Sequence, residues 1–347
     1  VTYARVEGFL AEKQPPSTGK QAPGTPSEII RGVELRDVLN PQVTANLRAR
    51  VTINATGPWS DLVLRLLQRD QPPPLLRPTK GSHIVIDWAR LPVQHAIVMS
   101  APQDQRVVFA IPWKDADVPA ASRTILGTTD TDYHGDPDRV AADAADIDYL
   151  MLCANHYFPD AKLVADDVMA TWSGLRPLVM PDASGLSASQ VSREHRIIDR
   201  PGLLTIVGGK LTTYRKMAAQ VVEAAYAQLG QAAPVCTTEE RPLPGAEKLL
   251  AAEDVDPIES VRLALLALGN PAIDAQVARH FAHKFGGRAL QVAALLGNDQ
   301  TGGQRLDPEL PFLMVEVDVA VRDELAQRIE DVLGRRVPLL LLARDQG

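Results

Sequence analysis

Two adjacent glycines and a lysine, Gly208, Gly209 and Lys210, stand where the character of the sequence changes. The apolar run before them is typical of a buried strand, and the segment after them, LTTYRKMAAQVV, has the spacing of an amphipathic helix. Glycines permit a sharp turn, and the free amides and dipole of a helix start favour a negatively charged group. The stretch therefore predicts a strand that turns into a helix and holds an anion there. A plain N-cap by one of the two threonines is the alternative.

A second strand-to-helix junction lies in VTINATGPWSDLVLRLL, where apolar residues follow a Gly-Pro break in helical spacing. Ala55, Thr56 and Gly57 are small residues at the end of the strand, and small residues permit the close approach of a ligand or of another backbone. The pattern fits a cofactor contact and a structural turn equally well.

Three further side chains have the chemistry of an anion or proton site. His83 enters a strand, and a histidine with its ordinary pKa of about 6.5 can take a proton near neutral pH. A packed or solvated histidine is the alternative. Arg176 lies in GLRPL, between a Gly and a Pro that constrain its backbone, as a positioned ligand requires, whereas a surface ion pair would explain it too. Arg193 lies in the charged run SREHR, for which a solvated cluster is the competing interpretation.

Acidic residues gather in GTTDTDYHGDP, which contains Asp130, Asp132, His134 and Asp136. Carboxylates and an imidazole can bind a metal ion. A hairpin with an acidic turn explains the same residues, because Asp, Gly and Pro form turns. We expect no metal site. The tryptophans 59, 113 and 172 are expected in the core or at a domain interface rather than in a redox relay.

The elements that must position these residues fall into three regions. A β-meander with a Pro- and Gly-rich insertion at 14–26 opens the chain, and short apolar runs between about 77 and 185 predict an antiparallel sheet. After residue 234, apolar spacings of three and four that end near Gly predict a helical domain. The fold class is α+β. We expect a partial cofactor-binding domain at 1–75 and 186–233, a substrate-binding sheet at 76–185 and a helical domain at 234–347.

Composition excludes several classes of protein. The net charge of −7, from 36 basic and 43 acidic residues, argues against a nucleic-acid binder. Cys153 and Cys236 form no CxxC motif, so neither a disulfide framework nor a cysteine metal site is indicated. Apolar stretches stay far below the roughly 18 residues that span a bilayer. We expect a soluble or peripheral protein.

Several motifs, read in order, resemble the FAD-dependent glycerol-3-phosphate dehydrogenases. They are NATGPW at Asn54, RPTKGSHIVI at Arg77, IPW at Ile111, ILGTTDTDYHGDP at Ile125, WSGLRPL at Trp172, SREHRIID at Ser192 and GGKLTTYRKMA at Gly208. The resemblance covers roughly residues 1–229, and VDVAVRDELAQRIEDVLGRR resembles the helical C-terminal domain of the same family.

The resemblance implies hydride transfer from C2 of sn-glycerol 3-phosphate to FAD, which yields dihydroxyacetone phosphate. It also implies an incomplete FAD-linked Rossmann-like part. His83, Arg176 and Lys210 match the family's catalytic residues, with His83 as a candidate base or phosphate ligand, and Arg193 matches a substrate-binding arginine. The implied FAD contacts are Ala55, Thr56, Gly57, Gly208, Gly209, Leu211, Thr212 and Thr213.

One departure is plain, because the family's phosphate loop GxGxxG does not occur in the sequence. With no initiating Met, we expect a fragment whose site an N-terminal segment completes. The family implies quinone or another electron acceptor such as oxygen, a cytoplasmic protein with possible peripheral contact on the inner membrane, and a possible homodimer. Two alternatives are a nonenzymatic module that binds a phosphometabolite, and an interaction role for the helical domain.

Overall fold

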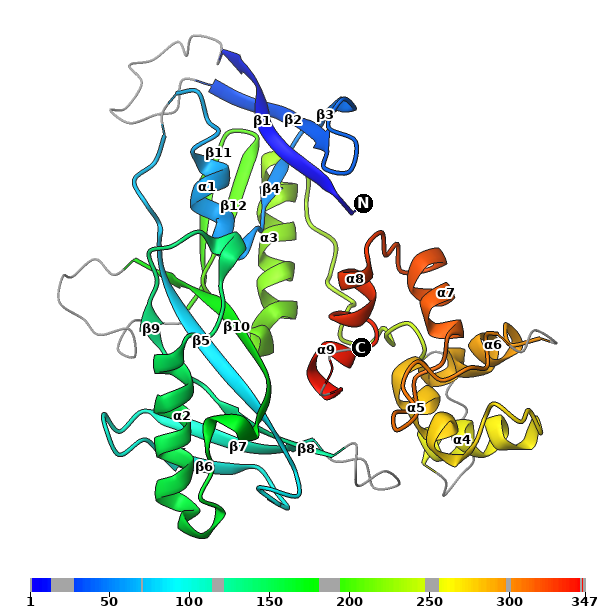
Figure 1. Cartoon of the computed structure of the whole chain (residues 1–347). Coiled ribbons are helices and arrows are strands. Elements are labelled where there is room, and N and C mark those ends of the chain that lie inside the picture. Colours follow the sequence, from blue (N-terminus) through cyan, green and yellow to red (C-terminus); the bar gives the residue numbers. More distant parts are fainter. Residues whose placement is uncertain are drawn as a thin grey trace. The chain divides into compact units, whose positions relative to one another are not determined.

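The computed structural model describes residues 2–13, 28–69, 71–113, 122–180, 194–246, 256–297, 301–343 and 345. Figure 1 shows the elements in chain order. The strands are β1 Ala4–Lys13, β2 Glu28–Asp37, β3 Thr44–Arg48, β4 Thr52–Asn54, β5 Leu76–Asp87, β6 Ile97–Ser100, β7 Val107–Trp113, β8 Arg123–Gly127, β9 Thr131–Asp132, β10 Val168–Val179, β11 Arg196–Arg200 and β12 Leu203–Val207. The α-helices are α1 Ser60–Leu64, α2 Ala144–Tyr157, α3 Tyr214–Gln228, α4 Pro257–Ala267, α5 Ala275–Phe285, α6 Ala289–Ala294, α7 Val315–Arg322, α8 Ile329–Leu333 and α9 Leu339–Leu342.

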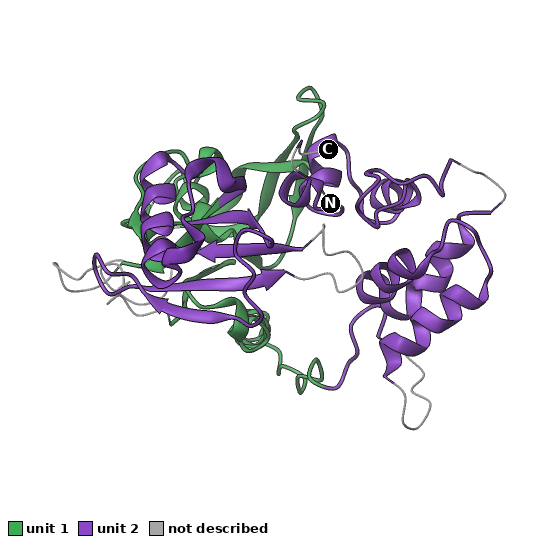
Figure 2. Ribbon diagram, turned by 60° about the horizontal axis from the view of Figure 1, so that its bottom comes forward, with its two compact units in different colours: residues 1–81, 130–141, 173–239 green, residues 82–129, 142–172, 240–347 purple. Residues whose placement is uncertain are grey.

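Sheets and a helical C-terminal part confirm the expected α+β class. The chain divides into two compact units, coloured green and purple in Figure 2. Unit 1 contains residues 1–81, 130–141 and 173–239, and unit 2 contains residues 82–129, 142–172 and 240–347. The three-domain division expected from the sequence stays a prediction.

The β-meander expected at the start of unit 1 is confirmed, because β1, β2 and β3 form an antiparallel sheet in that order. The Pro- and Gly-rich insertion expected between β1 and β2 lies outside the described residues. Apolar side chains of the meander pack with those of α1 and β12 to form the core of this unit. The buried members are Phe9, Ile30, Leu64, Leu67 and Leu203.

A second small sheet of unit 1 has the order β11-β12-β4. Strands β11 and β12 form a hairpin whose two loop residues, Pro201 and Gly202, suit a type II turn, because the ring fixes the first and the second has φ of 75°. Strand β12 pairs with β4 in parallel, with Leu203 opposite Thr52 and Thr205 opposite Asn54. The two strands therefore end at the same edge of the sheet.

The largest sheet confirms the antiparallel pattern expected between 77 and 185. Its strand order is β10-β5-β8-β7-β6, with β9 paired to the start of β5. In unit 2, alternate residues of β7 such as Val108 and Ala110 are buried beneath α2, whereas Phe109 and Ile111 are exposed on the other face. The core between this sheet and α2 includes Ile84, Leu126 and Leu150, which have no exposed surface.

The helical part of unit 2 begins at α4, and glycines end its helices as expected. Gly269, Gly286 and Gly297 follow α4, α5 and α6 with φ between 46° and 64°. Residues 315–334 have the apolar spacing of an amphipathic helix, but they form two separate helices, α7 and α8. Leu325 adopts a left-handed φ of 57° and the Ala326 amide bonds the Ala320 carbonyl, which closes α7. Among the described residues, no helix combines the length and apolarity needed to cross a bilayer.

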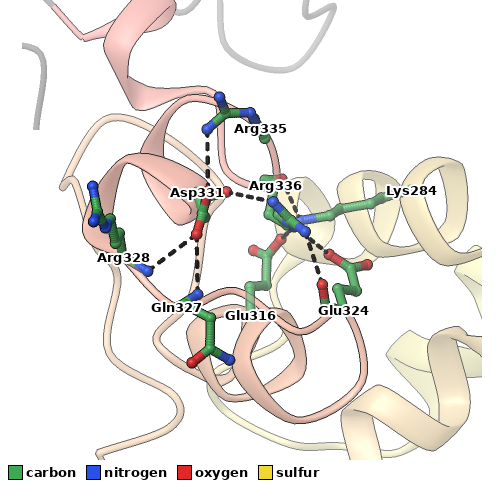
Figure 3. A network of polar contacts seen from close by, with 8 residues as sticks. All are labelled: Lys284, Glu316, Glu324, Gln327, Arg328, Asp331, Arg335 and Arg336. Carbon is green, nitrogen blue, oxygen red and sulfur yellow. Dashed lines mark hydrogen bonds and ion pairs between the residues drawn. The ribbon is translucent and has the colours of Figure 1, made fainter. Parts of the chain in front are cut away.

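A network of polar contacts joins α5 and α7 to the segment around α8 (Figure 3). Glu316 is its most buried member. Its carboxylate accepts bonds from Lys284 Nζ at 2.6 Å and from the Leu313 amide at 3.0 Å, and lies 2.9 Å from His280 Nε2. Burial alone would raise the pKa of the Glu316 carboxyl, but His280 and Lys284 hold that pKa below its usual range. Ionised Glu316 therefore stabilises this helix packing.

We expect Glu316→Gln to lower the local free energy of unfolding of α5 and α7 by about 2 kcal/mol at pH 7, since bonds to a charged group are lost. Amide hydrogen exchange of peptides from these helices should quicken by about 30-fold. Because the folded pKa is lowered, the stabilisation is present above the unfolded pKa of about 4.3 and is lost as pH falls through the folded value. The control is Glu330→Gln, at an exposed position of α8. Equal exchange rates in both variants would contradict the prediction.

Candidate functional site

The predicted site residues are divided between the two units. Residues 55–57, Arg176 and residues 208–213 belong to unit 1, and His83 belongs to unit 2. Arg193 lies outside the described residues, so its place in the site stays a prediction.

In unit 1 the structure brings together the two strand-to-helix junctions that the sequence indicates. Because β4 and β12 are parallel neighbours, Ala55–Gly57 and Gly208–Gly209 follow strands that end at one sheet edge. Ligands bind beyond the carboxyl ends of parallel strands in many α/β folds, where helix starts face the ligand. These two junctions together form the cofactor-site candidate of unit 1.

The turn after β12 requires both of its glycines. Gly208 and Gly209 have φ of 75° and 85°, which side chains rarely adopt. A Cβ on Gly208 would lie 2.6 Å from the Glu194 carbonyl oxygen, and a Cβ on Gly209 would collide with the end of the Met217 side chain. The expected sharp turn from strand to helix is confirmed, and its glycines are needed to build it.

The chain leaves this turn through a short 3-10 turn, Leu211–Thr213, before α3 begins. Within the described part of the chain, no acceptor contacts the amide groups of Leu211 and Thr212. Thr213 is the N-cap residue of α3, but its hydroxyl donates to the Lys210 carbonyl at 3.0 Å instead of capping the helix. Lys210 and the residues of the 3-10 turn are exposed. Donors at this helix start are thus available to an anion.

The junction after β4 is tied together by its own side chains. The Thr56 hydroxyl donates to Asn54 Oδ1 at 2.7 Å, and Asn54 Nδ2 donates to the Ser60 carbonyl at 3.2 Å. Gly57 has φ of 57°, and a Cβ there would meet open space. Ala55 and Thr56 are exposed. The turn that the alternative interpretation requires is present, and its outer surface is open to a ligand.

The Arg176 side chain is positioned by two residues of unit 1, Asp130 and Gly81. Its Nη1 lies 3.3 Å from Oδ1 of Asp130, and the two side chains are 24% and 11% exposed. The guanidinium also lies against Gly81, where any Cβ would collide with its nitrogen atoms. A planar guanidinium held beside a carboxylate and a side-chain-free strand position has the shape and charge to bind a phosphate or carboxylate.

The acidic residues around 130 act as partners of arginines and as turn formers. Asp132 forms two 2.7 Å bonds with Arg77, which raise the pKa of that arginine. Asp136 Oδ1 accepts the Asp138 amide at 3.0 Å at the start of a 3-10 turn. The turn interpretation therefore accounts for these side chains. Within the described ranges, no group of three or more His, Cys, Asp or Glu side chains is placed to hold a metal ion.

In unit 2, His83 lies on β5 opposite Gly127 of β8. Its imidazole stacks on Trp172, with ring centroids 4.7 Å apart and an angle of 9° between the planes. A side chain at position 127 would collide with the imidazole, so glycine makes room for the ring. This geometry fixes the orientation of His83 on the sheet.

Sequence reasoning missed the residues that seat these groups. No local sequence pattern predicts the roles of Gly81 and Gly127. Each glycine makes room for a side chain from another strand, Arg176 at Gly81 and His83 at Gly127. Trp172 was expected in the core or at a domain interface, and the structure places it against His83. Asp130 was considered only among the residues that could bind a metal ion, and its pairing with Arg176 was not predicted.

Comparison with known families places this geometry in context. The chain matches FAD dependent oxidoreductases over residues 24–215 and the C-terminal domain of alpha-glycerophosphate oxidase over residues 236–347. The chain therefore belongs to the FAD dependent oxidoreductase family. The resemblance to the FAD-dependent glycerol-3-phosphate dehydrogenases within that family is confirmed by similar proteins.

Glycerol-3-phosphate dehydrogenase of Synechocystis is 34% identical over 333 residues, which cover 92% of this chain and 57% of the relative. Alpha-glycerophosphate oxidase of Streptococcus pneumoniae is 30% identical over 400 residues, covering 99% and 61%. The structure of the glycerol-3-phosphate dehydrogenase from Bacillus halodurans complexed with FAD matches with a TM-score of 0.77 and 28% identity, over 99% of this chain and 62% of that one. The chain thus spans about half the length of the curated relatives it matches.

Proposed function

We propose that the complete protein oxidises sn-glycerol 3-phosphate to dihydroxyacetone phosphate with FAD as its cofactor. The observation that carries the proposal is the shared sheet edge of β4 and β12, where two strand-to-helix junctions of an FAD dependent oxidoreductase lie together. The names of the similar proteins supply the substrate, and FAD is bound in the similar structure from Bacillus halodurans.

The residues at this edge fit FAD. Left-handed Gly208 and Gly209 leave the turn without side chains, and the amides of Leu211 and Thr212 offer donors at a helix start. We propose that Ala55–Gly57 and Gly208–Thr213 hold the cofactor. FAD, when bound, supplies the acceptor for the hydride from C2 of the substrate. Donors at a helix start favour the negative charge that a flavin carries on reduction.

The chain's own side chains would bind and orient the substrate. The Arg176 guanidinium, which lies against Gly81 and beside Asp130, binds the phosphate dianion through its positive charge and planar shape. Arg193 supplies a second positive charge to the same phosphate. Lys210, at the glycine turn, stabilises negative charge near the reacting centre, and an imidazole nitrogen of His83 takes the proton of the C2 hydroxyl.

Anaerobic addition of glycerol 3-phosphate to the complete flavoprotein should bleach its flavin absorption band, because the substrate reduces the cofactor. The measurement is a visible spectrum before and after addition, with glycerol as the matched control that lacks the phosphate. A flavin band that glycerol 3-phosphate leaves unchanged would contradict the proposed reaction and favour a nonenzymatic phosphometabolite-binding module.

The electrons from the substrate must finally reach an acceptor, which the complete protein can be used to identify. Its relatives include proteins named dehydrogenases and proteins named oxidases, so we propose quinone or oxygen as the oxidant. Oxygen consumption with glycerol 3-phosphate separates the two. A cytoplasmic location, peripheral contact with a membrane surface and a homodimer belong to this proposal as predictions.

A further inference from the structure

Asp146 is a buried carboxylate on α2 that neither the motifs nor the proposed chemistry uses, and it holds two segments of the unit 2 sheet. Asp146 Oδ2 accepts the Ser82 hydroxyl at 2.9 Å, and Oδ1 accepts the Thr129 hydroxyl at 2.9 Å. The Thr129 hydroxyl oxygen also accepts the Ser82 amide at 3.0 Å, and the Thr129 amide donates to the Ser82 carbonyl at 3.3 Å. The three residues therefore form a closed network.

Burial makes each bond of this network matter. Asp146 is 4% exposed, Thr129 is 3% exposed and Ser82 has no exposed surface. A buried carboxylate or hydroxyl without partners carries a large desolvation penalty, so the sequence must satisfy these groups. The carboxylate also lies in the first turn of a 14-residue helix, where the helix dipole favours negative charge.

Helix capping does not account for the contacts with Ser82 and Thr129. Asp143 and Asp146 form a reciprocal capping box, in which Asp146 Oδ2 accepts the Asp143 amide at 3.1 Å. That single bond completes the cap. The two hydroxyl contacts reach across to the sheet, and they join α2 to β5 and to the residues that follow β8.

Ser82 and Thr129, the two residues that Asp146 binds, lie next to the His83–Gly127 pair. Ser82 immediately precedes His83 on β5, and Thr129 lies two residues after Gly127, the cross-strand partner of His83. Because the imidazole rests on Gly127 and stacks on Trp172, a small shift of either segment would move the ring off this seat.

We propose that Asp146 is a positioning residue for His83, which it orients by holding Ser82 and Thr129. The carboxylate fixes the two chain segments at one end of the His83–Gly127 pair, Ser82 before His83 and Thr129 after Gly127. Its effect on turnover rests on the proposed function, whereas its effect on the orientation of the imidazole does not.

The orientation is measured by NMR of protein with ¹³C-labelled histidine at pH 8, where an ordinary histidine is mostly neutral. The His83 signal is identified by its loss in His83→Gln. Its ring-current shift is the difference from Trp172→Leu, which removes the stacked indole. We expect Asp146→Asn, which removes one of two acceptor oxygens, to abolish at least half of that shift. Asp143→Asn, which keeps a good N-cap and leaves the Asp146 carboxylate in place, should leave it unchanged.

Two less disruptive variants at Thr129 test the proposal if Asp146→Asn does not fold. Thr129→Val keeps the shape and removes the hydroxyl, so it should reduce the ring-current shift, and Thr129→Ser, which keeps the hydroxyl, should restore it. A folded Asp146→Asn or Thr129→Val with an unchanged His83 signal and only a lower Tm would overturn the proposal and leave a structural role.

The complete flavoprotein adds a second measurement. In Asp146→Asn, the rate at which glycerol 3-phosphate reduces the flavin should fall by about tenfold, with normal FAD content. A misplaced reacting group slows turnover. A protein that glycerol 3-phosphate never reduces would contradict the proposed function and leave the NMR result to decide the role of Asp146. Normal reduction kinetics together with an altered His83 signal would contradict the link to turnover.

Discussion

Arg176→Lys in the complete enzyme is expected to lower kcat/KM for glycerol 3-phosphate by about 100-fold, roughly 2.7 kcal/mol of transition-state stabilisation, with little change in Tm. Lysine keeps the positive charge, but it loses the planar fork that binds two phosphate oxygens at once. The measurement is steady-state turnover with an artificial electron acceptor, paired with thermal unfolding.

The seat of Arg176 strengthens this expectation. Gly81 offers a flat surface that a guanidinium covers, and an ammonium on a flexible stem would neither fill that surface nor keep the same direction toward Asp130. Arg77→Lys is a matched control, because Arg77 is also 24% exposed and also paired with an aspartate of the same segment. Equal losses in the two variants would show a general effect of replacing an aspartate-paired arginine, and near-normal efficiency would remove Arg176 from the substrate site.

Local features of the fold were predictable where a few neighbouring residues decide the backbone. Gly208 and Gly209 predict a sharp turn, and both adopt positive φ in it. The glycines after α4, α5 and α6 also predict helix ends. Strand alternation in β7 likewise follows from the period of two. The break at Leu325 was not predictable, because leucine disfavours the left-handed region and tertiary contacts, such as the bond from Arg336 to the Glu324 carbonyl, surround it.

The candidate site was predictable only as a set of residue types. The motif resemblance identifies Arg176 and His83, but their seats depend on pairings between strands that are distant in sequence. Parallel pairing of β4 with β12 joins Thr52 to Leu203, and no local pattern contains that register. Asp146 illustrates the same limit, since a carboxylate in a first helical turn reads as a cap until the sheet beneath it is known.

Lys210→Met in the complete enzyme is expected to slow flavin reduction in a single anaerobic turnover by about 30- to 1,000-fold, which corresponds to about 2 to 4 kcal/mol for one positioned charge-stabilising donor. Methionine keeps much of the aliphatic stem and removes the charge. Gly208 and Gly209 still form the turn, so FAD content and folding should stay normal. The measurement is stopped-flow absorbance of the flavin after mixing with glycerol 3-phosphate.

The matched control is Lys216→Met. Lys216 is exposed on the following helix, α3, so this variant removes the same charge at a position outside the turn. A general electrostatic effect would slow both variants alike, whereas a positioned Lys210 slows only its own. Unchanged kinetics in Lys210→Met would make Lys210 a surface residue of the turn. Loss of FAD with normal folding would assign Lys210 to cofactor binding, because the amides of Leu211 and Thr212 would then be insufficient to hold the group. The rate of the reductive step in protein with full FAD content is therefore the quantity that separates a role in hydride transfer from a role in binding.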